Sequence, residues 1–171
     1  HRIHRPGDSP MFFGPVGAEP RFRFDSPDGD YKTLYAARSL ETAFGETLVR
    51  SPAIPYVTST AVNARVRSEL ITTRSLKLYP LVDAGISAHG LSFTDLHGDA
   101  YAKTWAISEE NHRATTADGI LYTSRFDNQR CIALFDRAAD AVATTPACGL
   151  PISPALATVL AHHFGKTYVE P

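Results

Sequence analysis

Residues 120–136 have the sequence ILYTSRFDNQRCIALFD, in which two short apolar segments, ILYTS at 120–124 and CIALFD at 131–136, flank the polar linker RFDNQR. The apolar segments are rich in β-branched and aromatic residues and have the length of ordinary strands. A polar linker between two such segments is typical of a connection between strands. We therefore predict two strands here and assign the remaining chain outward from them.

Further strands are predicted on both sides of this pair. RFRF at 21–24 alternates polar and apolar residues, and YKTLYAA at 31–37 follows the turn-forming cluster SPDGD, so residues 21–37 are expected to form a hairpin. The proline- and glycine-rich residues 6–20 predict a loop. Shorter strands are expected over residues 1–5, twice within residues 61–83 around ARVRSELI and SLKLYPLV, and in KTYVE near the C-terminus.

About three helices are predicted. Residues 39–50 begin at Ser39, a favourable N-cap, and carry apolar residues at helical spacing. A second helix is expected over about residues 99–110, and a third over 153–164, which opens with serine and proline and is followed by glycine. The chain is therefore predicted to be a single α+β domain over residues 1–171 with a strand-rich core.

The composition limits the classes of function. The formal net charge of −1 lacks the basic excess of a general nucleic-acid binder. No apolar run approaches the roughly 18 residues of a membrane helix. The two cysteines, Cys131 and Cys148, form neither a disulfide framework nor a zinc pattern, which favours a reducing, cytoplasmic location. The adjacent His162 and His163 would point to different faces of a helix, so no metal site is predicted.

Polar residues within the predicted elements are the candidates for chemistry. The glycine-rich, zinc-binding and serine-hydrolase motifs that mark common enzyme sites are absent. Each candidate also has an ordinary structural explanation: Arg23 as an edge-strand arginine reaching water, Tyr35 as a core tyrosine, Glu46 as an ion-pair partner of Arg50, and Ser124 as a strand-end hydroxyl bonded to backbone. Taken singly, these residues indicate only a soluble α+β domain.

Taken in order, the segments that carry these residues resemble the RES domain, a family named for an arginine, a glutamate and a serine. Members typically show a GGRWN-like strand, an LY strand, a helix ending in E-x-L-V, and a D-G-I-x-Y-x-S strand followed by an L-F strand. The matching segments here are Arg23-Phe24-Asp25, Leu34-Tyr35-Ala36, Glu46-Thr47-Leu48-Val49 and Gly119-Ile120-Leu121-Tyr122-Thr123-Ser124-Arg125. The departures are Arg21-Phe22 in place of two glycines, Phe-Asp in place of Trp-Asn, and a longer segment over residues 51–98.

The resemblance implies a fold like that of ADP-ribosyltransferases and an enzyme that destroys NAD as the toxin of a toxin–antitoxin pair. NAD would be a substrate rather than a cofactor, and no metal would be needed. The acceptor of ADP-ribose is water, phosphate or, as the alternative activity, a target protein. A binding module that has lost turnover is a third possibility. The resemblance also implies two partners: a cognate antitoxin or immunity protein, and a second copy of the chain in a homodimer. The enzyme would act in the cytoplasm, either where it is made or after delivery as the toxic domain of a longer secreted effector.

The same resemblance implies roles for the site residues. Glu46 would stabilise the positive charge that develops on the ribose, and Arg23 with Arg2 would bind the diphosphate. Tyr35 would stack on nicotinamide, and Ser124 would position the substrate rather than attack it. Two residues that follow Ser124 are expected at the rim of the pocket, Arg125 and Asn128, although a turn-forming role suits Asn128 equally well.

Overall fold

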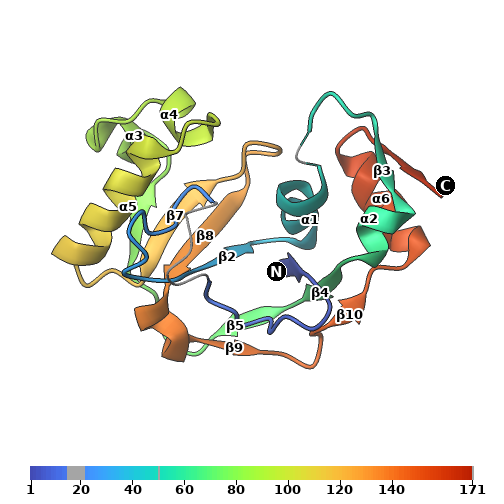
Figure 1. The fold of residues 1–171 in the computed structure, drawn as a ribbon, viewed down its shortest axis with the longest axis horizontal. Coiled ribbons are helices and arrows are strands. Elements are labelled where there is room, and N and C mark those ends of the chain that lie inside the picture. The colour runs from blue at the N-terminus through green and yellow to red at the C-terminus, as the bar shows by residue number, and fades with distance from the viewer. Residues whose placement is uncertain (15–21, 50, 171) are drawn as a thin grey trace.

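A four-stranded sheet forms the centre of the computed structural model, which describes residues 1–14, 22–49 and 51–170. Its strands lie in the order β2 (Thr33–Ala37), β8 (Arg130–Phe135), β7 (Gly119–Thr123) and β6 (Leu78–Leu81) (Figure 1). β8 runs antiparallel to both of its neighbours, and β6 runs parallel to β7. The two strands predicted within residues 120–136 are therefore confirmed, and they pair directly with each other.

The three longest helices are the three that the sequence predicts. They are α1 (Leu40–Leu48), α5 (Ala102–Ala114) and α6 (Pro154–His163). Ser39 and Ser153 cap α1 and α6, since their side-chain oxygens accept hydrogen bonds from Thr42 N and Leu156 N. Short helices not predicted are α2 (Ser59–Asn63), α3 (Ala84–Ala88), α4 (Phe93–His97) and the 3-10 helix η1 (Asp136–Ala141).

Three smaller sheets surround the central one. In the first, β1 (Arg2–His4) and β10 (Leu150–Pro151) flank β4 (Val66–Ser68). In the second, β3 (Tyr56–Thr58) pairs in parallel with β11 (Thr167–Val169). In the third, β5 (Leu70–Thr72) pairs with β9 (Val142–Thr144). The strands expected at the two ends of the chain are thus present. The segment around ARVRSELI forms two strands, β4 and β5, which belong to different sheets.

The predicted hairpin over residues 21–37 is wrong, although the strand predicted at 31–37 is confirmed as β2. Arg21 lies outside the described residues. Residues 22–25 form turns and bends rather than a strand, and Ser26 follows without regular structure. Asp25 closes this turn, because its backbone N–H donates to Phe22 O and its carboxylate accepts from Phe22 N. The polar–apolar alternation arises because Phe24 is fully buried while Phe22 remains exposed. β2 pairs with β8 instead.

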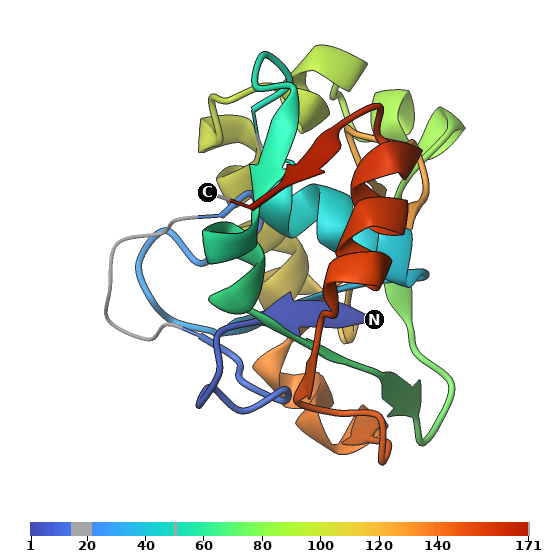
Figure 2. The ribbon, with the colours of Figure 1, turned by 90° about the vertical axis from the view of Figure 1, so that its right-hand side faces the viewer.

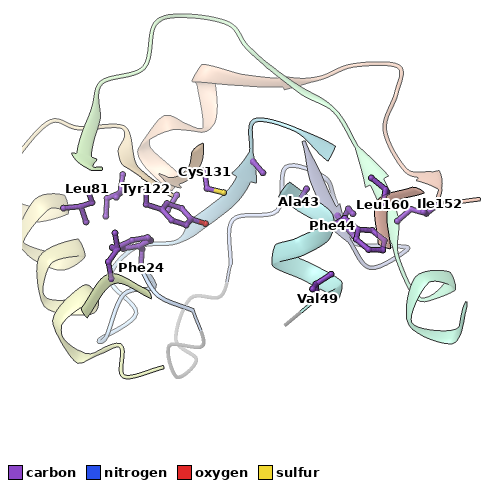
Figure 3. Close-up of a cluster of buried hydrophobic side chains, with 14 of the residues drawn as sticks. Phe24, Ala43, Phe44, Val49, Leu81, Tyr122, Cys131, Ile152 and Leu160 are labelled. Atoms are coloured by element: carbon purple, nitrogen blue, oxygen red, sulfur yellow. The ribbon is translucent and has the colours of Figure 1, made fainter. Parts of the chain in front are cut away.

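One hydrophobic core runs from the central sheet to α6. Figure 3 shows Phe24, Leu81 and Tyr122 in the part of this core next to the sheet, and Phe44 and Leu160 in the part between α1 and α6. Figure 2 shows α6 in front of α1, with β11 beside β3. The helices α3, α4 and α5 lie at the opposite end of the sheet (Figure 1). α1 is therefore held between the sheet and the C-terminal helix, and this position places Glu46.

Candidate functional site

Tyr122 is the residue on which two charged candidates, Glu46 and Arg23, both act electrostatically. It lies in β7, is 6% exposed, and packs against Phe24 with ring centroids 5.0 Å apart. Burial raises the pKa of its hydroxyl well above the ordinary value; Cys131 and the Glu46 carboxylate raise it further, while the Arg23 guanidinium opposes them. Both charged groups therefore act on one buried hydroxyl, although they come from α1 and from the 22–26 turn. Figure 3 shows this hydroxyl close to the Cys131 sulfur.

Glu46 is half-buried on α1 and faces the β7–β8 hairpin. Burial, Glu46 and Asp127 together raise the pKa of the Cys131 thiol, so this cysteine is protonated at neutral pH. The Thr42 hydroxyl on the same helix donates to Asp127 Oδ2 at 2.7 Å. This bond ties α1 to the turn of the hairpin and fixes the position of Glu46 relative to Tyr122.

Arg23 lies on the opposite side of this group of residues, against the start of α5. Its guanidinium carbon is 5.4 Å from the centre of the Tyr101 ring, within the range of a cation–π contact. Its Nη1 atom is buried and has no hydrogen-bond partner among the residues that the structure describes. Because a buried donor without an acceptor is costly, this nitrogen is suited to an acceptor supplied by a ligand.

The segment that connects α4 to α5 completes this side of the site. His97 Nε2 lies 3.3 Å from Thr123 Oγ1, and Asp99 pairs with Arg125 at 2.8 Å. Burial lowers the pKa of His97 to about 4, and Arg23 and Arg125 lower it as well, so its ring is neutral at pH 7. Sequence analysis missed His97, Tyr101 and Tyr122, because nothing in their local pattern shows which residues of other segments they contact.

Ser124 directly follows Thr123, the last residue of β7. It is 1% exposed, its backbone N–H donates to Gln129 O at 2.8 Å, and its Oγ accepts from Phe126 N at 3.1 Å. Asn128 has a left-handed backbone with a φ of 57° and is exposed within the same turn. The turn-forming role expected for Asn128 as one of two alternatives is therefore present.

Tyr35 holds the turn that carries Arg23. Its hydroxyl donates to Asp25 Oδ1 and accepts from Phe24 N, both at 2.9 Å, and its ring packs edge-on against Phe22. Arg2 makes a comparable structural contact elsewhere: it donates to Pro10 O and Phe12 O at 2.9 and 2.8 Å. The structure thus brings Glu46 and Arg23 within electrostatic reach of Tyr122, and Arg23 and Arg125 within electrostatic reach of His97. Tyr35 supports the turn that carries Arg23, and Arg2 is directed toward the loop after β1.

Two cavities, of about 250 and 320 Å³, lie on the other face of the central sheet and are lined by none of the predicted site residues. We place the site by its converging charges and unpaired polar atoms instead. Across the described ranges 1–14, 22–49 and 51–170, no three His, Cys, Asp or Glu side chains come together as a metal site would require. In those ranges there is also no helix with the length and apolar character needed to cross a membrane.

The fold and the site together define a small α+β domain in which a carboxylate and a guanidinium meet at a buried tyrosine. The family model of the RES domain matches residues 1–154 of this chain, which therefore belongs to the RES domain family. No curated protein and no solved structure matches it. The family is associated with NAD-related toxin function. The chain is therefore an enzyme that acts on NAD, and its family places it among the toxins of toxin–antitoxin systems.

Proposed function

We propose that this domain cleaves the bond between nicotinamide and ribose in NAD and passes the ADP-ribose to water or phosphate. The observation that carries the proposal is that a carboxylate, Glu46, and a guanidinium, Arg23, from separate elements both act electrostatically on the buried Tyr122 hydroxyl. NAD presents two features that need opposite charges: an anionic diphosphate, and a ribose carbon that becomes cationic as nicotinamide leaves. The site offers one charge of each sign from two separate elements.

Glu46 is assigned to the ribose. As the C1′–N bond breaks, its electron pair goes to the nicotinamide nitrogen and the ribose gains oxocarbenium character. A carboxylate aimed at that charge stabilises the transition state more than the ground state, and a half-buried one does so more strongly than one in water. Water or phosphate then bonds to C1′, and water loses its proton to Glu46 or to solvent.

Arg23 and Ser124 are assigned to binding and orientation. The planar guanidinium of Arg23 can bind two phosphate oxygens at once, and its buried Nη1 has no hydrogen-bond partner within the described part of the chain. The Ser124 Oγ accepts a hydrogen bond from Phe126 N. Its hydroxyl hydrogen can therefore donate to the nicotinamide amide or to the ribose. Arg125, paired with Asp99, lies beside them.

The activity is tested by incubating the purified protein with NAD, with and without phosphate, and following free nicotinamide, ADP-ribose and its phosphorylated form. Nicotinamide release with a small-molecule ADP-ribose product supports the proposal. Label from NAD that accumulates on protein would instead indicate ADP-ribosyl transfer. A folded protein that releases no nicotinamide under any of these conditions would contradict both activities and leave a binding module.

The assignment of Glu46 is tested by Glu46→Gln. Removal of the negative charge is expected to lower kcat by about 10²–10³-fold, the size of effect typical for a group that stabilises transition-state charge. Glu41→Gln on the first turn of the same helix is the matched control and should retain nearly full activity. Circular dichroism of both variants shows whether the fold is intact. Near-normal turnover by Glu46→Gln would overturn the assignment.

A further inference from the structure

The end of α4 and the connection to α5 contact the site at alternate residues. His97 contacts Thr123 of β7, Asp99 pairs with Arg125, and Tyr101 lies under the Arg23 guanidinium. Three contacts within five residues hold His97 beside two arginines that come from different parts of the fold. The Phe93 ring, one helical turn earlier, packs on the imidazole with centroids 4.0 Å apart and fixes its plane.

His97 carries a second polar atom that the fold does not use. The residue is 9% exposed, and its Nδ1 is buried without a hydrogen-bond partner in the described ranges. Arg23 Nη1 is in the same condition. Two neighbouring side chains therefore each present a desolvated nitrogen, which is costly unless a ligand completes the hydrogen bond.

The chemistry of these nitrogens selects the ligand. Guanidinium nitrogens only donate, so the group facing Arg23 must be an acceptor. The neutral imidazole carries one proton, and when the Thr123 hydroxyl donates to Nε2 that proton lies on Nδ1. Nδ1 then also donates. Two donors beside the positive charges of Arg23 and Arg125 suit the oxygens of an anion.

We infer that His97 is a substrate-binding residue, whose Nδ1–H donates to an oxygen of the diphosphate that Arg23 also binds. The identity of the ligand rests on the proposed function; the anion site itself does not. The ring stays uncharged between two arginines, because burial and both guanidiniums keep its pKa near 4. It therefore adds a directional donor without adding a third positive charge.

Two substitutions separate the two ring nitrogens. In His97→Asn the amide nitrogen takes the place of Nδ1, whereas in His97→Gln the longer side chain reaches the place of Nε2 and Thr123. Binding of inorganic pyrophosphate and of ADP-ribose is measured by calorimetry for each, in the inactive Glu46→Gln background. His89→Gln is the matched control, because His89 also contacts a hydroxyl, that of Tyr79, and lies outside the site.

We expect His97→Gln to raise the Kd for both anions about tenfold, which corresponds to the loss of one charge-assisted hydrogen bond. His97→Asn should stay within about threefold of the background, and His89→Gln should be unchanged. The reverse order, with Asn the weaker binder, would show that only the Thr123 contact matters and would overturn the inference. Equal binding by all variants, or no anion binding at all, would also overturn it.

This experiment separates the inference from the proposed function. Pyrophosphate contains no ribose bond to cleave, so its binding is independent of turnover. His97-dependent pyrophosphate binding in a protein that never releases nicotinamide would refute the proposed function and retain the anion site. Turnover of NAD without His97-dependent pyrophosphate binding would retain the proposed function and refute the anion site at His97.

Discussion

Tyr122 lies between two charged residues of opposite sign that the chain brings from separate elements. Its ring is buried, so the surroundings are poorly screened and the charges of Glu46 and Arg23 act on it strongly. Such an arrangement costs stability unless each polar atom is paired, and within residues 1–14, 22–49 and 51–170 Arg23 Nη1 has no partner. Perturbed titratable groups of this kind are typical of functional sites.

Tyr35 supports the turn that carries Arg23, and Tyr35→Phe tests this role. Tyr35→Phe removes one donor to the buried Asp25 carboxylate and the acceptor of Phe24 N. We expect a loss of about 1–3 kcal/mol in the free energy of unfolding and a higher KM for NAD, because the turn that carries Arg23 loosens. Thermal unfolding and steady-state kinetics measure these effects, with the half-exposed Tyr56→Phe as the control. The phenylalanine ring still stacks, so unchanged stability and KM would favour the predicted role of Tyr35 on nicotinamide.

α1 is the element on which the site depends most. It contributes Glu46, it is tied to the β7–β8 turn by Thr42, and its other side packs against α6. The contact with α6 is close at Gly45, where an added Cβ would lie 2.6 Å from Phe164 Cζ. Glycine weakens a helix interior, and here it permits the close approach of the two helices.

Gly45→Ala is therefore expected to destabilise the protein by about 1–2 kcal/mol, because the clash with Phe164 exceeds the gain of roughly 1 kcal/mol in helix propensity. Phe164→Leu removes part of the clashing ring. In the double variant the loss should be smaller than the sum of the two single losses, as thermal unfolding of all four proteins would measure. Strict additivity would contradict the packing argument.

At the scale of the molecule, the fold extends beyond the residues matched by the family model. α6 begins at Pro154, the last matched residue, and β11 lies wholly beyond it, yet Ala157, Leu160 and Ala161 are buried in the main core. β11 pairs in parallel with β3, from Thr167 opposite Tyr56 onward. The C-terminal segment is thus part of the domain that supports α1.

A chain that ends at Ser153 is expected not to fold, because it loses a face of the core and leaves the edge of β3 unpaired. We predict no cooperative thermal transition and no near-ultraviolet circular dichroism for this truncation. Removal of residues 170 and 171 alone is the control and should leave unfolding unchanged. A truncated chain with the full-length melting temperature would show that α6 and β11 are dispensable.

The strands of the central hairpin and the caps of α1 and α6 could be predicted from the sequence, because they depend on residues close together in the chain. The α+β class and the family could be predicted from the order of short segments along the chain. Alternation alone misassigned residues 22–24, since a turn that buries Phe24 and exposes Phe22 has the same pattern as a strand. Which side chains of distant segments act on one another is visible in the folded structure alone. Tyr122 and His97 show no local signal, because their surroundings come from α1, the 22–26 turn and the α4–α5 connection, which long-range packing brings together.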